Sequence, residues 1–230
     1  MKDNPELVVL NRPKSNVSED IRTIRTNLQF TSNDEEAKVI LVASSIPGEG
    51  KSFVSSNLAT AFAQNNETTL LIDSDLRLGR IHKIFNVSNK QGLSNLLVES
   101  DVTDCADFIK KTNIDNLFVI TRGTVPPNPS ELLNSSNARK LIDFLKKQFD
   151  HIIFDGVPVN GLPDSLILAS LVDRVIIVAS AGYTKTEDLN DTKKALEKID
   201  ANIAGVVLNR TNKVKRGKYS NYYYGYYEQR

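Results

Sequence analysis

The sequence of 230 residues contains a single cysteine, Cys105. One cysteine cannot form an intramolecular disulfide, and it offers no CxxC pair for zinc or an iron-sulfur cluster. The sequence also has little net charge, because 29 Lys and Arg residues almost balance 28 Asp and Glu residues. The whole molecule therefore has no field that would recruit nucleic acid or anionic lipid, and we expect no nucleic-acid partner.

A long uninterrupted apolar run is missing as well. The longest apolar region, residues 162–181, is broken by Asp164, Asp173 and Arg174, and the first five residues lack the apolar core of a signal peptide. We therefore expect no membrane-spanning helix and a cytoplasmic location. Without a Pro-, Ser- or Gly-rich linker, the simplest organisation is one α/β domain over residues 1–212, followed by a flexible tail over residues 213–230.

Short apolar runs alternate with helix-length segments along the chain. The runs cover residues 39–43, 68–72, 117–121, 151–154, 174–179 and 203–208, and the helical segments include 53–64, 138–148 and 187–199. This alternation predicts an α/β fold with a mostly parallel central sheet and helices on both faces. Ligands of such sheets bind beyond the carboxyl ends of the strands.

Residues 44–52, Ser-Ser-Ile-Pro-Gly-Glu-Gly-Lys-Ser, lie between the first expected strand and a helical segment. This order is typical of a nucleoside-triphosphate site, although Ser45 stands where the strict pattern has glycine. The glycines let backbone N–H groups point at phosphates, Lys51 places its charge at the β- and γ-phosphates, and the Ser52 hydroxyl can ligate Mg²⁺. A helix start after a turn is the alternative. The predicted nucleotide-binding residues here are Ser45, Pro47, Gly48, Glu49, Gly50, Lys51, Ser52 and Phe53.

Acidic or amide side chains follow three of the expected strands, as Asp73 and Asp75, as Asp155, and as Asn209 with Arg210. Parallel strands end at one edge, so these side chains should converge near the phosphate loop. A lone acid after a strand is as often a turn or helix-cap residue, but three together favour function. We expect Asp155 to help hold Mg²⁺, while one of the other two acids steadies the ion and the other receives a proton from the attacking group.

The motifs at residues 47–52, 71–77 and 153–158 resemble those of bacterial tyrosine kinases, in the MinD/ParA-like branch of P-loop NTPases. Residues 19–25 and 126–133 also match, so the resemblance covers nearly the whole chain. It implies ATP and Mg²⁺ as ligands, with Lys51, Asp73, Asp75 and Asp155 as catalytic residues. The family uses all three acids around Mg²⁺, and Asp73 matches its favoured proton acceptor. The resemblance also implies base contacts by Asn209 and Arg210.

Six of the seven tyrosines lie close together after the basic stretch 213–218; they are Tyr219, Tyr222, Tyr223, Tyr224, Tyr226 and Tyr227. The segment has no helical or alternating apolar pattern, and we expect it to be mobile. A sticky aromatic tail and a strand added to a partner's sheet are alternatives. The resemblance implies that these phenols are phosphorylated by a neighbouring subunit, and the added negative charge would then end the assembly.

Residues 18–32 are expected to form a helix with Ser18 as its N-cap. Glu19, Arg22 and Arg25 recur at a spacing of three and so share one helix face, which by itself indicates only a solvated surface. The resemblance implies that this face makes subunit contacts in a ring-like homo-oligomer. It also implies a separate membrane protein whose cytoplasmic tail activates the kinase at the inner face of the membrane, and a role in capsular or exopolysaccharide synthesis.

Two other functions share this scaffold. A MinD/ParA-like switch ATPase acts through nucleotide-dependent assembly, but such proteins usually carry a lysine near the start of the phosphate loop, where this chain has Ile46. A metabolic enzyme that phosphorylates a small carboxylate would leave the tyrosine cluster unexplained. The preference for ATP over GTP comes from the resemblance, since the sequence has no guanine-reading Asn-Lys-x-Asp segment.

Overall fold

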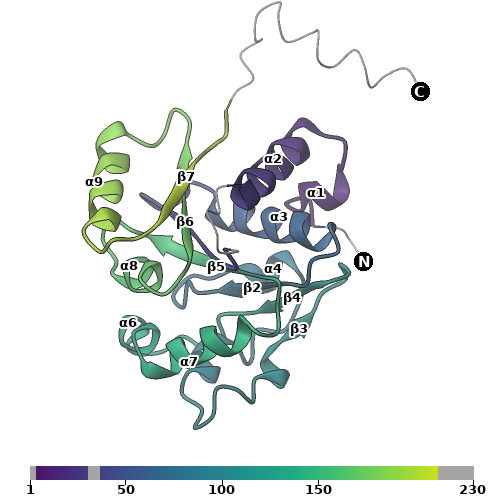
Figure 1. The fold of residues 1–230 in the computed structure, drawn as a ribbon, viewed down its shortest axis with the longest axis vertical. Coiled ribbons are helices and arrows are strands. Elements are labelled where there is room, and N and C mark those ends of the chain that lie inside the picture. Colours follow the sequence, from purple (N-terminus) through teal and green to yellow (C-terminus); the bar gives the residue numbers. More distant parts are fainter. Residues whose placement is uncertain (1–3, 31–36, 212–230) are drawn as a thin grey trace, which may run out of the picture.

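The computed structural model describes residues 4–30 and 37–211. The basic stretch and all six predicted phosphoacceptor tyrosines lie outside these residues. Within them, seven strands form one sheet in the order β3-β4-β2-β5-β1-β6-β7 (Figure 1). The strands are β1 Val39–Ser44, β2 Thr69–Asp73, β3 Lys110–Lys111, β4 Leu117–Ile120, β5 His151–Pro158, β6 Arg174–Ser180 and β7 Ile203–Asn209.

The strand pairs are parallel except for β3, which runs antiparallel to β4. All six strands expected from the sequence are confirmed. Strand β3 was not expected, because two residues are too few to show a pattern. The mostly parallel α/β architecture is therefore as predicted.

Helices cover both faces of the sheet, and the longer ones lie within a few residues of the segments expected. They are α1 Val8–Asn11, α2 Asn16–Phe30, α3 Lys51–Ala63, α4 Ile81–Ile84, α5 Leu93–Leu96, α6 Pro129–Leu133, α7 Ser136–Leu145, α8 Asp164–Ala169 and α9 Thr186–Glu197, with a 3₁₀ turn at Ala106–Phe108.

The two faces of the sheet have separate apolar cores, because successive residues of a strand point to opposite sides. On β1, Leu41 packs in a cluster with residues of α7, α8 and α9, whereas Ile40 packs in a cluster with residues of α3 and α4. Strand β1 is buried along its whole length, as expected for a central parallel strand. This burial fixes the position of the loop that follows β1.

Helix α2 begins at Asn16, two residues earlier than expected. The hydroxyl of Ser15 accepts a hydrogen bond from the Ser18 backbone N–H at 3.2 Å, so Ser15 is the N-cap. Ser18 is buried inside the first turn, and its hydroxyl donates to the Arg12 carbonyl at 2.7 Å. The prediction that Ser18 caps this helix was wrong, because the serine three residues earlier takes that position.

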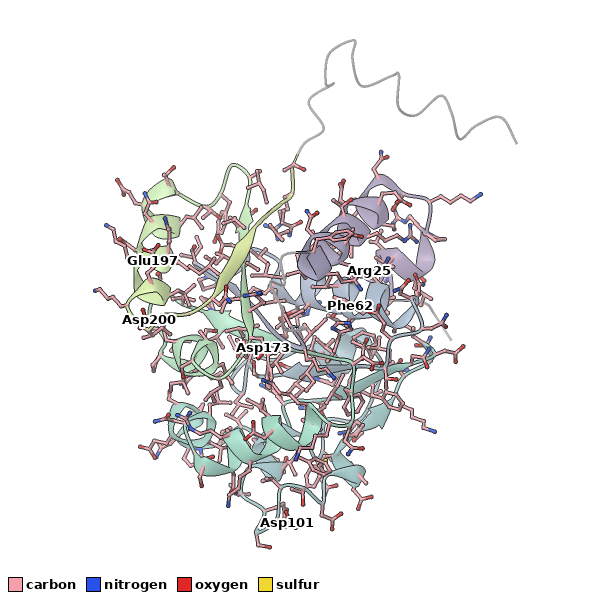
Figure 2. All side chains as sticks on the ribbon, viewed as in Figure 1. Arg25, Phe62, Asp101, Asp173, Glu197 and Asp200 are labelled. Atoms are coloured by element: carbon pink, nitrogen blue, oxygen red, sulfur yellow. The ribbon has the colours of Figure 1, made fainter. Side chains whose placement is uncertain are left out.

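The charged residues of α2 have partners within the chain. Arg22 pairs with Glu19 at 2.5 Å, and Arg25 donates to the Ala61 carbonyl at 2.7 Å. Figure 2 shows Arg25 near the end of α3 where Phe62 lies. Arg25 therefore fastens α2 onto α3, and the role of this face in subunit contacts stays a prediction. Among the residues that the structure describes, no helix is long and apolar enough to cross a bilayer.

Candidate active site

The loop between β1 and α3 contains two glycines with left-handed backbone conformations. Gly48 has φ 83° and Gly50 has φ 97°, a region that side-chain-bearing residues rarely adopt. Gly50 also lies against Asn209, since a Cβ placed on Gly50 would come within 2.1 Å of the Asn209 Nδ2 atom. Helix α3 starts directly after it at Lys51. The loop thus has the shape that the sequence motif predicted.

Hydrogen bonds involving Glu49, Tyr183, Thr184 and Asn209 hold this loop in place. Glu49 is fully buried; one carboxylate oxygen accepts from the Ile46 N–H at 2.9 Å, and the other accepts from the Thr184 hydroxyl. Asn209 donates from its side chain to the Glu49 carbonyl at 2.9 Å, and the Tyr183 hydroxyl donates to the Pro47 carbonyl at 3.3 Å. The side chain of Glu49 is part of this support, and nucleotide binding by Glu49 as a residue of the phosphate loop stays a prediction. Tyr183 and Thr184 carry no sequence signal for such a role.

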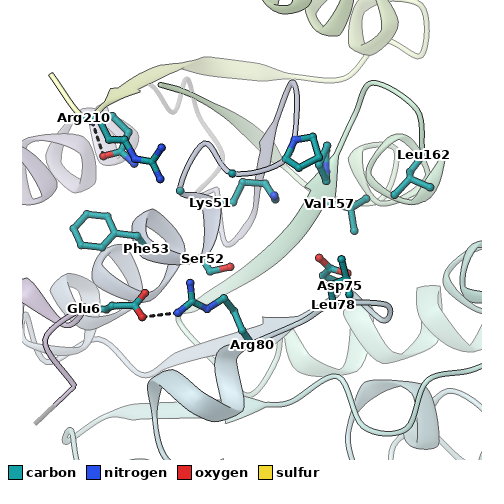
Figure 3. A pocket seen from close by; sticks show the side chains of 15 residues that line it. Glu6, Lys51, Ser52, Phe53, Asp75, Leu78, Arg80, Val157, Leu162 and Arg210 are labelled. Atoms are coloured by element: carbon teal, nitrogen blue, oxygen red, sulfur yellow. Dashed lines mark hydrogen bonds and ion pairs between the residues drawn. The ribbon is translucent and has the colours of Figure 1, made fainter. Parts of the chain in front are cut away.

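A pocket of about 650 Å³ opens beside the loop, beyond the carboxyl ends of the strands (Figure 3). Of the predicted nucleotide-binding residues, Pro47, Gly48, Gly50, Lys51, Ser52, Phe53, Asn209 and Arg210 line it, and so does Asp75. Ser45 and Glu49 are not in the lining and are buried. Sequence reasoning missed Glu6, Leu78, Arg80, Val157, Pro158 and Leu162, which also line the pocket.

Asp73 and Asp155 lie opposite each other in the register of β2 and β5, and neither residue lines the pocket. Both are buried. One Asp73 oxygen accepts from the Ile81 backbone N–H at 3.0 Å. Among the described residues, the Oδ1 atoms of Asp73 and Asp155 have no hydrogen-bond partner. Two buried carboxylates thus lie side by side, and each has one oxygen without a hydrogen-bond partner among the described residues.

This burial disfavours negative charge on both acids. Burial raises the pKa of Asp73 well above its usual value, and the neighbouring Asp155 raises it further. Burial also raises the pKa of Asp155 to about 6, although the Ser52 hydroxyl and the Lys51 charge partly oppose the shift. Ionising both carboxyl groups next to the phosphate loop is therefore costly without a cation.

The unsatisfied oxygens of Asp73 and Asp155 fit a divalent cation, since hard cations prefer oxygen ligands. Asp75 uses its Oδ1 to accept from the backbone N–H groups of Arg77 and Leu78 at 3.2 and 2.8 Å, and its charge helps to raise the pKa of Asp73 and of Asp155. No cluster of three or more His, Cys, Asp or Glu side chains within residues 4–30 and 37–211 is arranged to hold a metal. The structure thus brings two of the three predicted acidic ligands together, and the role of Asp75 as a metal ligand stays a prediction.

Comparisons with known proteins agree with this site. A family model described as an AAA domain matches residues 37–208. The chain is 38% identical to a putative tyrosine-protein kinase, CapB of Staphylococcus aureus, over 96% of this chain and 95% of that protein. It is 36% identical to the tyrosine-protein kinase YwqD of Bacillus subtilis (strain 168), over 95% of this chain and 91% of that protein.

Solved structures that resemble this chain include a chimerical protein and a cell division ATPase. The chimerical protein CapA2B2 superposes with a TM-score of 0.86 at 37% identity, covering 91% of each chain. The cell division ATPase MinD of Pyrococcus furiosus superposes with a TM-score of 0.66 at 24% identity, covering 78% of this chain and 75% of that chain, which shows a shared fold. From the length of the matches and the kinase relatives, we conclude that this chain belongs to the bacterial tyrosine-protein kinase family, whose catalytic domain has the MinD-like P-loop fold.

Proposed function

We propose that this kinase uses ATP and Mg²⁺ to phosphorylate the C-terminal tyrosine cluster of a neighbouring copy, and that it acts in capsular or exopolysaccharide synthesis. The observation that carries the proposal is the pair of buried aspartates with open oxygens beside Lys51 and Ser52. A phosphoryl-transfer site needs cations around the polyphosphate, which Lys51 and a divalent ion held by the two aspartates would supply. The names of the relatives support tyrosine as the acceptor.

Each residue of the site has a definite task in this reaction. The loop N–H groups and Lys51 bind the phosphates and stabilise the charge that builds up on the departing ADP. Ser52, Asp73 and Asp155 would hold Mg²⁺, which supplies further neutralisation of the phosphate charge. The acceptor oxygen forms the new bond to the γ-phosphorus as the bond to the β-phosphate oxygen breaks.

The phenol proton passes to a carboxylate. Asp73 is the proposed acceptor, because it ends β2 beside Asp155 and matches the proton acceptor that the family resemblance favours. Asp73 does not line the pocket, whereas Asp75 does. Direct contact between the tyrosine and Asp73 therefore requires the 75–80 segment to shift, and Asp75 is the alternative acceptor. Kinase assays on Asp73→Asn and Asp75→Asn separate the two, since loss of the proton acceptor should lower kcat with little change in nucleotide affinity.

The proposal includes two kinds of partner. Copies of this chain would assemble in a ring through the α2 face that carries Glu19, Arg22 and Arg25. A separate membrane protein would supply an activating cytoplasmic tail and so place the kinase at the inner face of the membrane. The similarity to a chimerical protein named CapA2B2 supports such a two-protein arrangement.

The experiment compares the full-length chain with a variant in which all six tail tyrosines are replaced by phenylalanine. Both are isolated from the cells that produce the protein, so that any activator is present, and phosphotyrosine is located by mass spectrometry. Tyr183 is then the one tyrosine left, which makes the residual signal easy to assign. We expect the tail variant and Lys51→Met each to lose the modification. Wild-type levels of phosphotyrosine in the tail variant would refute the proposed acceptor.

A further inference from the structure

An ion pair crosses the nucleotide pocket on the side that faces the phosphate loop. Arg80 Nη2 lies 2.5 Å from Glu6 Oε1, and both residues line the pocket. Figure 3 shows the guanidinium of Arg80 turned toward Glu6, and Ser52 lines the same pocket. The two side chains are 49% and 33% exposed, so solvent reaches both partners. No motif in the sequence accounts for either residue.

The backbones on both sides of this pair are fixed. The buried Asn57 of α3 accepts from the Val9 N–H at 3.0 Å and donates to the Glu6 carbonyl at 2.8 Å. Arg80 directly precedes α4, whose first residue, Ile81, donates to Asp73. The two side chains can therefore change partners while the backbone stays in place.

A carboxylate at this position does not suit a pocket for a polyphosphate. Nucleotide phosphates would bring negative charge next to Glu6, which repels it, and next to Arg80, which attracts it. Arginine binds phosphate through a planar fork of N–H donors, and such charge-assisted pairs are stronger than neutral hydrogen bonds. A solvent-exposed ion pair contributes little by comparison. Bound polyphosphate should thus displace Glu6 from Arg80.

We propose that Arg80 is a polyphosphate-binding residue of the nucleotide site, and that Glu6 is the counter-ion it leaves when nucleotide binds. The inference rests on the proposed use of a nucleoside triphosphate in this pocket. Arg80 would contact the phosphates from the side opposite to the loop, so that the polyphosphate has a cation on each side. Glu6 sets the affinity by competing for the same guanidinium.

Isothermal titration calorimetry with Mg·ADP and with a non-hydrolysable Mg·ATP analogue tests this on the full-length protein. We expect Arg80→Gln to weaken binding about tenfold, the loss of one charge-assisted contact. Glu6→Gln should tighten binding about threefold, because Arg80 no longer has a competing partner. Lys193→Gln is the matched control, since Lys193 forms an exposed ion pair with Glu197 on α9. It should bind like the wild type.

The signs of these effects decide the question. If the ion pair is only a tether between the N-terminal segment and α4, both substitutions should change affinity in the same direction, and the inference is wrong. If Glu6 acts only by its charge, Glu6→Gln should tighten binding equally with and without Arg80. Our proposal requires a smaller gain in the Arg80→Gln background. Thermal unfolding checks that the variants are folded, and a wild-type protein that binds no nucleotide would refute the proposed function rather than this inference.

Discussion

Asp155 should make the metal-free protein less stable at neutral pH than at acid pH. Its pKa rises from 3.8 to about 6 because the carboxyl is buried. The folded protein therefore binds more protons than the unfolded chain between these values, so stability falls as the pH rises through this window. A shift of roughly 2 units corresponds to about 3 kcal/mol. Asp155→Asn removes the titrating group, and at pH 7.5 it should stabilise the protein by up to about 3 kcal/mol.

Urea unfolding between pH 4 and pH 8, in EDTA and without nucleotide, measures this effect. The two proteins should be similarly stable at pH 4, the advantage of the variant should grow between pH 4 and pH 6, and it should stay constant above about pH 6. Adding Mg·ADP should stabilise the wild type and have less effect on the variant, since ligand binding to the native state adds to its stability. At pH 7.5 with Mg·ADP, the difference in unfolding free energy that favours the variant should therefore shrink or reverse.

The exposed Asp143 of α7 offers a control with the same chemical change. Asp143→Asn should leave the unfolding free energy within about 0.5 kcal/mol of the wild type at every pH. If Asp155→Asn follows the wild-type pH profile in EDTA, the carboxyl does not titrate in this window, and our account of the acidic pair is wrong.

Three further predictions concern other parts of the molecule. Glu49→Ala should lower the unfolding free energy by about 3 kcal/mol in urea titrations, because the Ile46 N–H and the Thr184 hydroxyl lose their buried acceptor. An effect below about 1 kcal/mol would show that water replaces the lost carboxylate. Lys51→Met should reduce affinity for Mg·ADP at least tenfold in calorimetry, and unchanged affinity would argue against the phosphate site. If the chain forms the proposed ring, charge reversal at Arg22 and Arg25 should leave monomers in sedimentation experiments, and a ring that stays intact would exclude the α2 face as its interface.

The sequence allowed the sheet and the phosphate loop to be predicted because both depend on local patterns. Six apolar runs became six strands, and Gly48, Gly50, Lys51 and Ser52 occupy the positions that the motif implies. The burial of Asp73 and Asp155 follows from their place on central strands: Asp73 ends β2, whereas Asp155 lies within β5, which runs four residues further than the sequence indicated. These features are determined by residues close together in the chain.

The parts that could not be predicted arise from contacts between distant segments. Thr184 meets Glu49 across 135 positions of sequence, and Arg80 meets Glu6 across 74. Neither pair has a local pattern. The N-cap of α2 was misplaced for a different reason, because two serines three residues apart both fit the capping rule and only tertiary packing buries the second one.

The inward orientation of Glu49 has a consequence for how mutational data on this enzyme should be interpreted. Its carboxylate, together with Thr184 and Asn209, fixes the loop in its binding shape before any ligand arrives, so little conformational entropy remains to be lost on association. A substitution there should weaken nucleotide affinity although Glu49 does not line the pocket. Residues identified by loss of affinity at this loop therefore include some whose contribution is preorganisation.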